Sequence, residues 1–259
     1  MVEADGGRLK LEWEMLRART GARVEDLLWW EGERLLGFLG FYGFGSTLEL
    51  AGMVAPEARR RGIGTALLDA AVPLYQGRGL REALLIVPRR SAAGRRLALS
   101  RGAVLAHSEH ALVLSRAPAG GPDGPALSLR QATAADLPFL LRLLEQAFGE
   151  PPPDDMAASL NSSRGRTLLI EMRGSAVGTL RITRDGDDAA IYGFAVDPPR
   201  QGQGFGRSAL RRACEQLLSA GARRIRLEVA VDNDRALGLY TSLGFTPVTT
   251  EDYFALPLS

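Results

Sequence analysis

The chain has 259 residues, of which 46% are hydrophobic, and its 32 basic side chains nearly balance 30 acidic ones. A packed core is therefore expected, and a net charge of +2 gives no reason to expect nucleic acid or an anionic membrane as partner. The single cysteine, Cys214, excludes an intramolecular disulfide, and with only two histidines it cannot complete a usual zinc site. With neither a secretory signal nor a membrane-length apolar run found, we expect a cytoplasmic protein without a metal.

The first half of the chain begins with a predicted helix over 9–19, followed by a strand over 24–30. A proline- and glycine-rich segment then interrupts the chain at 118–125. Proline is excluded from helix interiors and glycine makes ordering costly, so this segment is predicted to be a linker. We therefore expect two domains, 1–117 and 126–259.

The second half shows clear periodicity. Alternating or β-branched runs predict strands, and apolar residues at helical spacing predict helices. The expected strands are 127–131, 167–172, 176–184, 189–196, 224–231, 245–248 and 253–258. One helix is expected to begin after Thr133, and a second, short helix is expected after Pro151-Pro-Pro153 and ends near 161. Two further helices are expected over 206–220 and 234–243.

The two halves repeat each other at an offset of 142 residues. Val54-Ala-Pro56 corresponds to Val196-Asp-Pro198, and Gly62-Ile-Gly64 corresponds to Gly204-Phe-Gly206. Single glycines further along the chain keep the same offset. This self-similarity indicates a duplicated fold.

The sharpest motif is the glycine-rich run Gln201-Gly-Gln-Gly-Phe-Gly206, between a predicted strand and a predicted helix. Glycines allow successive backbone N–H groups to approach a ligand, and the helix start adds the positive end of its dipole. The pattern therefore predicts a diphosphate site. It matches neither the nucleoside triphosphatase loop nor the G-x-G-x-x-G dinucleotide fingerprint.

The run from Val196 to Gly206 resembles the acetyl-CoA signature of the GNAT N-acetyltransferases, [QR]-x-x-G-x-[GA]. The resemblance continues in Leu227-Glu-Val229, in Asn233-x-x-Ala236 and in Leu239-Tyr-x-x-x-Gly-Phe245. It implies an α/β (α+β) fold with two tandem GNAT-like domains, each a mixed, mostly antiparallel sheet flanked by helices. In this family, acetyl-CoA lies in a V-shaped split between the fourth and fifth strands.

The resemblance also implies which residues bind acetyl-CoA. Backbone groups of Phe194, Ala195 and Val196 would bond the pantetheine arm, and the Val196 N–H would stabilise the developing oxyanion. Asn233 would bond the same arm, or it is simply a helix N-cap. The residues that would hold the diphosphate are Gln201, Gly202, Gln203, Gly204, Phe205, Gly206 and Arg207.

Tyr240 matches the family's general acid, which protonates the leaving thiolate, although it could also be an ordinary core tyrosine. Many relatives use a glutamate on the strand before the loop as general base. The first copy has Glu49 there, whereas the second has Ile191 at the matching offset. Glu228 on the next strand is then the best candidate, against a purely structural role or a water chain.

Glu251 and Asp252 could attract a cationic amine, although loop carboxylates are more often just solvated. In the first copy, Ala98 and Ser91 replace the tyrosine and the asparagine, so we expect that copy to be degenerate. The leading hypothesis is an acetyl-CoA-dependent N-acetyltransferase, monomeric or homodimeric, whose acceptor is a small-molecule or peptide amine. The alternative is a protein that binds or senses acetyl-CoA without transferring the acetyl group.

Overall fold

The computed structural model describes residues 10, 16, 19–21, 23–44, 46–76, 78–119, 124–149, 156–160 and 165–258. The helix expected over 9–19 falls largely outside these residues, as does the middle of the expected linker, 120–123.

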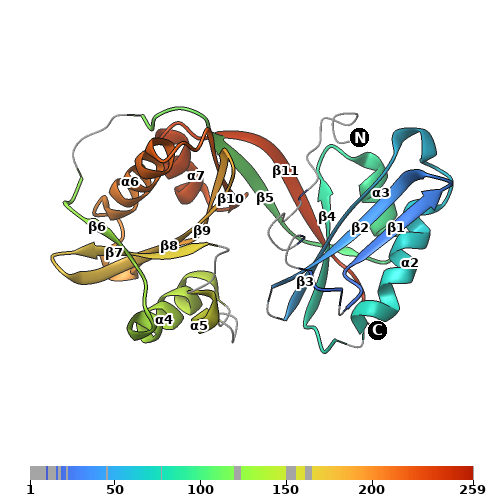
Figure 1. The fold of residues 1–259 in the computed structure, drawn as a ribbon, viewed down its shortest axis with the longest axis horizontal. Coiled ribbons are helices and arrows are strands. Elements are labelled where there is room, and N and C mark those ends of the chain that lie inside the picture. The colour runs from blue at the N-terminus through green and yellow to red at the C-terminus, as the bar shows by residue number, and fades with distance from the viewer. Residues whose placement is uncertain are drawn as a thin grey trace. The chain divides into compact units, whose positions relative to one another are not determined.

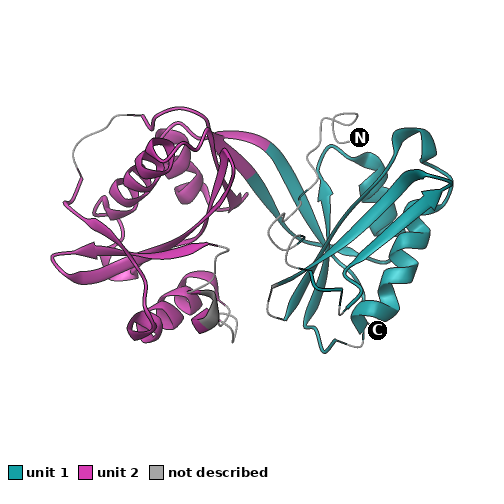
Figure 2. Cartoon of the chain, viewed as in Figure 1, with its two compact units in different colours: residues 1–110, 249–259 teal, residues 111–248 magenta. Residues whose placement is uncertain are grey.

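The chain folds into two compact units, residues 1–110 with 249–259 and residues 111–248 (Figure 2). The chain passes from one unit to the other within β5, Val104–Leu114, and again within β11, Thr246–Ala255. Each unit is therefore completed by a strand from the other half of the sequence. The ranges 1–117 and 126–259 describe the repeats of the sequence rather than these compact units.

β11 corrects one expectation from the sequence. Two closing strands with solvated carboxylates between them were expected, whereas the structure has one unbroken strand that pairs with β4, Glu82–Pro88. Glu251 and Asp252 are buried within it. Asp252 accepts hydrogen bonds from Arg89 and from the Ser108 hydroxyl, so the polar run stays extended instead of turning.

Unit 1 contains a sheet in the order β1-β2-β3-β4-β11-β5 (Figure 1). The pairings from β1 to β3 are antiparallel, whereas β3 and β4 are parallel and pair only from Thr47↔Glu82 to Leu50↔Leu85. The helices α2 and α3 pack over one face. The remaining elements of this unit are β1 Asp26–Glu31, β2 Arg34–Phe44, β3 Thr47–Val54, η2 Pro56–Ala58, α2 Ile63–Gln76 and α3 Ala92–Ser100.

Unit 2 contains a sheet in the order β5-β10-β9-β8-β7-β6, antiparallel from β6 to β9 and parallel between β9 and β10. Figure 1 shows α6 and α7 on one face and α4 and α5 on the other. Its other elements are β6 Ser128–Gln131, η3 Ala134–Asp136, α4 Leu137–Phe148, α5 Met156–Ser159, β7 Arg166–Met172, β8 Ser175–Asp185, β9 Asp188–Val196, η4 Pro198–Arg200, α6 Phe205–Ser219, β10 Arg224–Ala230 and α7 Asp234–Ser242. The expected pair of mixed, helix-flanked sheets is confirmed.

Each unit has its own large hydrophobic core. The core of unit 1 includes Phe254 and Leu256 from the end of the chain, and that of unit 2 includes Leu112 and Leu114 from β5. Cys214 lies fully buried in the second core, and burial raises the pKa of its thiol to about 12, so it is a core residue. None of the described helices is both long and apolar enough to cross a bilayer.

We call this arrangement, in which each half of the sequence gives a strand to the unit of the other half, the strand exchange. It makes the end of the chain essential to unit 1. Phe254→Ala empties a site that is 1% exposed in the unit 1 core, and should lower the unfolding free energy by about 3–5 kcal/mol. Hydrogen exchange should accelerate in β2, β3 and β4. The matched change Phe245→Ala, in the unit 2 core, should instead accelerate exchange in β7, β8 and β9. If hydrogen exchange in the Phe254 variant were faster only in unit 2, Phe254 could not be part of the unit 1 core.

Candidate functional site

The glycine-rich loop has the same backbone conformation in both copies. Gly62 and Gly204 have φ values of 83° and 84°, and Arg60 and Gly202 have values of 65° and 75°. A left-handed conformation costs a non-glycine residue roughly 1–2 kcal/mol, so unit 1 keeps the loop shape despite strain at Arg60. In each copy the loop leads into a long helix, α2 or α6. The arrangement fits an anionic ligand such as a diphosphate.

The first residue of the signature fixes the loop to the preceding strand. The Gln201 side-chain amide donates to the Val196 carbonyl at 3.0 Å, and Arg59 Nε donates to the Val54 carbonyl at 3.2 Å. Gln203 similarly donates to the Pro199 carbonyl at 2.9 Å. These side chains shape the loop, and the backbone is left to meet a ligand.

A β-bulge interrupts β9 immediately before the loop. Thr179 pairs with Ala195 and Arg181 with Tyr192, so one residue more lies on β9 than on β8, and Gly193 has a φ of 54°. The parallel pairing with β10 ends before the bulge, at Arg226↔Ala190. The backbone groups of Phe194, Ala195 and Val196 that face β10 therefore have no place in the hydrogen-bonded ladder between β9 and β10. These backbone groups can bond a ligand arm in the split.

Unit 1 has no such bulge, because β2 and β3 keep an unbroken register. Strand residues before the bulge therefore correspond at an offset of 141 rather than 142: Thr47 pairs with Glu82 as Asp188 pairs with Arg224. The expected equivalence of Glu49 and Ile191 is wrong, and the equivalent residue is Ala190. Unit 2 still lacks a glutamate at this place.

Tyr240 lies on α7 and is 7% exposed. Its ring centre is 6.5 Å from that of Phe194, at the bulge, and 6.1 Å from that of Phe245. Burial raises the pKa of its phenol to about 12. The hydroxyl therefore keeps its proton at neutral pH.

Asn233 caps α7 through its side-chain oxygen, which accepts from the Ala236 N–H at 3.0 Å. Ser91 caps α3 in the same way, accepting from the Gly94 N–H at 3.2 Å. The N-cap interpretation of Asn233 is confirmed. Capping uses the oxygen, so the amide nitrogen can still donate to a ligand.

Glu228 follows Arg226, the last residue of β10 that pairs with β9. Its neighbours Leu227 and Val229 point into the same core as Tyr240, so Glu228 faces the opposite side of the sheet. The structure therefore places the two predicted catalytic residues on opposite faces, next to one split.

Three residues at the start of α6 have distinct places. Phe205 is buried in the core, and Arg207 donates to the Ser242 hydroxyl at 2.6 Å. A side chain at Gly206 would begin within 3.5–3.7 Å of Leu239, Phe194 and Val196. Glycine there leaves room between the helix and the split.

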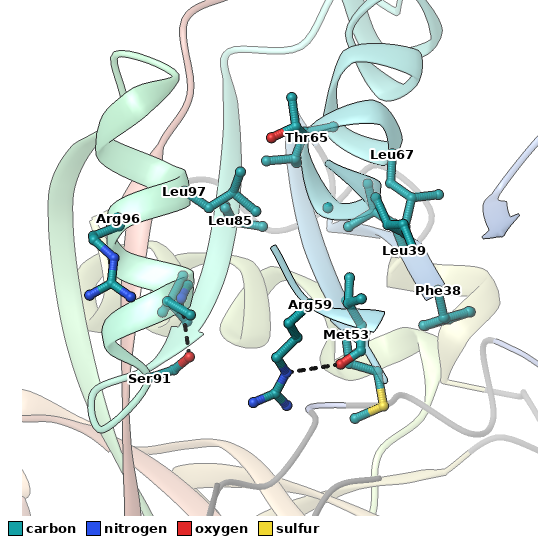
Figure 3. A pocket seen from close by; sticks show the side chains of 18 of the residues that line it. Phe38, Leu39, Met53, Arg59, Thr65, Leu67, Leu85, Ser91, Arg96 and Leu97 are labelled. Atoms are coloured by element: carbon teal, nitrogen blue, oxygen red, sulfur yellow. Dashed lines mark hydrogen bonds between the residues drawn. The ribbon is translucent and has the colours of Figure 1, made fainter. Parts of the chain in front are cut away.

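Unit 1 contains a pocket of about 520 Å³ where β3 and β4 separate (Figure 3). Figure 3 shows Arg59 beside Met53, with Arg96 on α3 across from it. Arg60 and Gly62 also line the pocket, and most of the other lining residues are apolar. A basic entrance above an apolar slot fits a ligand with a phosphorylated end and a long uncharged arm.

One polar cluster in unit 1 was not anticipated from the sequence. Lys10 contacts both Glu49 and Tyr253 on the sheet face opposite α2. Glu49 was noted, but Tyr253 was assigned to the other copy. These residues come together only because β11 joins the unit 1 sheet, and local sequence patterns do not reveal that pairing.

Comparison with known families matches the acetyltransferase (GNAT) family over residues 4–102 and 136–245. The chain is 31% identical over 114 residues to a ribosomal protein bS18-alanine N-acetyltransferase of Escherichia coli, which covers 44% of this chain and 77% of that relative.

Two solved structures share the whole fold. One is a GCN5-related N-acetyltransferase from Sphaerobacter thermophilus, with a TM-score of 0.81, 20% identity, and coverage of 99% of this chain and 89% of the other. The other is a tandem GNAT protein from the clavulanic acid biosynthesis pathway, with a TM-score of 0.67, 17% identity, and coverage of 92% and 85%. Together with the family match in each half, they establish that this chain belongs to the GNAT acetyltransferase family, in its two-domain form.

Proposed function

We propose that the protein is an acetyl-CoA-dependent N-acetyltransferase whose working site is in unit 2. It transfers an acetyl group to a primary amine of a small molecule or peptide by direct attack. The observation that carries the proposal is the β9 bulge beside the buried phenol of Tyr240. Unit 1 has neither, since its β3 is regular and Ala98 stands in place of the tyrosine.

Acetyl-CoA, when bound, supplies the acyl thioester. The backbone of the loop, Gln201 to Arg207, would hold its diphosphate at the start of α6. The backbone of Phe194, Ala195 and Val196 would bond the pantetheine, helped by the Asn233 amide nitrogen. The Val196 N–H then donates to the oxygen that becomes negative during the attack.

The two proton transfers take place on opposite faces of the sheet at the split. Glu228, on the face away from the core, accepts the proton of the attacking amine. Tyr240, on the core side, donates a proton to the departing thiolate sulfur, and its raised pKa keeps that proton available. No proton has to cross from one face to the other.

The acceptor is proposed by class only. The Escherichia coli relative is named for an alanine of a ribosomal protein, which supports a peptide amine among the candidates. We further propose a cytoplasmic monomer or homodimer that needs neither nucleic acid nor membrane.

Tyr240→Phe tests the general acid. The ring and its packing are kept, so stability and acetyl-CoA affinity should stay close to wild type. The kcat should fall roughly 10²–10⁴-fold with little change in KM, because the hydroxyl acts mainly in the transition state. Release of free CoA thiol with a panel of amines is the measurement. Near wild-type turnover by the variant would exclude this role. A wild-type protein that releases no thiol with any amine would favour the sensing alternative.

The pH profile provides a second test. Because burial raises the pKa of Tyr240 from 10 to about 12, the proton donor persists through the range in which an exposed tyrosine ionises. We expect no fall in kcat centred near the ordinary value of 10. Steady-state rates on the alkaline side measure this. A fall near that pH in wild type that is absent from Tyr240→Phe would contradict the burial argument.

Glutamate substitutions at corresponding positions test which unit binds acetyl-CoA more tightly. Arg207 and Thr65 are the third residues of α6 and α2, where a glutamate favours the helix dipole but repels a diphosphate. Arg207→Glu should weaken the tighter binding event roughly tenfold to a hundredfold, and Thr65→Glu only the weaker one. Titration calorimetry separates the two. If Thr65→Glu instead weakened the tighter binding event, the main site would be in unit 1.

A further inference from the structure

A polar cluster around the buried side chains of Lys10 and Tyr253 lies on the face of the unit 1 sheet away from α2 and α3. Alternation along β3 and β11 sends Leu50 and Phe254 into the core, and therefore turns Glu49 and Tyr253 to the other face. Its members are Lys10, Glu49, His107, Glu109 and Tyr253.

The ammonium of Lys10 is at the centre of this cluster. It donates to the Tyr253 hydroxyl at 2.7 Å and lies 3.3 Å from Glu49 Oε2. The Tyr253 hydroxyl in turn donates to Glu109 Oε2 at 2.7 Å, and His107 stacks on the Tyr253 ring at 4.3 Å. Lys10 is only 7% exposed. Its nitrogen is therefore held beside one carboxylate and connected through a hydroxyl to another.

Glu49 lies next to the split between β3 and β4, and residues on both sides of this split line the unit 1 pocket. The ladder between these strands ends at Leu50↔Leu85, one residue beyond Glu49. The pocket opens from there, and its wall includes Val54 and Ile86. Ile86 also packs against Tyr253 on the cluster side. Beyond Leu50, no hydrogen-bonded ladder separates the amine side from the pocket side.

We propose that Lys10 is a self-acetylation site, whose nitrogen takes the acetyl group from acetyl-CoA bound in the unit 1 pocket, with Glu49 as base. This rests on the proposed function, because the donor is the same. Lys10 is the only lysine in the chain, so the modification has a single possible lysine target.

The step balances without any further reagent. The Lys10 ammonium gives one proton to Glu49, and the free nitrogen attacks the thioester carbonyl carbon. A C–N bond forms as the C–S bond breaks. The nitrogen's second proton ends on the sulfur, so the products are acetyl-lysine and the free thiol, and Glu49 returns its proton to solvent.

Acetylation would change unit 1 itself. The amide is neutral, so the Glu49 carboxylate, whose side chain is 16% exposed, loses the ammonium that faces it. Loss of this ion pair, at a site that is mostly screened from water, destabilises the surrounding fold. The modification thus connects the supply of acetyl donor to the stability of unit 1.

The test is to incubate the purified protein with isotopically labelled acetyl-CoA and map the label by peptide mass spectrometry. We expect one acetyl group on Lys10, acquired at a first-order rate that does not depend on protein concentration. Glu49→Gln should slow labelling roughly 10²-fold or more, the range for a lost general base. Glu57→Gln, on the surface beside Arg34, is the control and should label normally.

Thr65→Glu provides a variant that leaves the cluster intact, so a folding defect at Glu49 cannot decide the outcome. It should slow labelling by weakening donor binding in unit 1. The melting temperature gives a readout that does not depend on turnover, and it should fall when Lys10 is acetylated. Lys10→Gln, which removes the charge, should lower it by a similar amount, whereas Lys10→Arg, which keeps the charge, should not.

Equal labelling of the Thr65→Glu variant, or labelling as fast in urea-unfolded chains, would overturn the proposal, as would an unlabelled Lys10 in a protein that acetylates free amines. Tyr240→Phe separates the two proposals. It should lower turnover on free amines roughly 10²–10⁴-fold and leave Lys10 labelling intact. Labelling of Lys10 in a wild-type protein that acetylates no amine would refute the proposed function alone.

Discussion

The site depends on one constraint, the separation of two parallel strands next to the start of a long helix. In unit 2 the ladder between β9 and β10 stops at Ala190, and in unit 1 that between β3 and β4 stops at Leu50. Beyond those points the backbone has polar groups to satisfy and a gap to fill. The loop conformation then sets helix N–H groups at the mouth of the gap. Strained Arg60 shows that this shape is maintained even where glycine is absent.

The two units have diverged around that shared gap. Unit 2 has a bulge and a buried tyrosine, and its carboxylate, Glu228, is on the second strand of the split. Unit 1 has a regular β3 strand and no tyrosine on α3, and its carboxylate, Glu49, is on β3, the first strand of the split. In both units the glutamate faces away from the core. In both proposals the amine therefore reaches the split of its unit from the sheet face that has the glutamate.

The glycine-rich loops could be predicted because their glycines meet a local requirement of the backbone. The roles of Phe194, Ala195, Val196 and Tyr240 rest on the resemblance to the GNAT family and stay predictions. The family resemblance implies a bulge in the strand before the loop, but its position in β9 could not be read from the sequence, since Gly193 looks like any strand glycine until its φ of 54° is known. The closing strand was misjudged because the polar run before Tyr253 resembles a turn. Its extended form depends on β4, Arg89 and Ser108, which are distant in sequence. The contact of Lys10 with Tyr253 spans 243 residues, beyond any local pattern.

The strand exchange explains why a copy without the tyrosine persists. Unit 2 takes Leu112 and Leu114 of β5 into its core, and unit 1 takes Phe254 and Leu256. A chain lacking its first half would lose those leucines and leave β10 without β5 as its neighbour, an exposed edge prone to aggregation. Selection on the chemistry proposed for unit 2 would therefore preserve the sheets of both units. The sheet of unit 1 keeps its pocket, and its surroundings are then free to acquire a separate use.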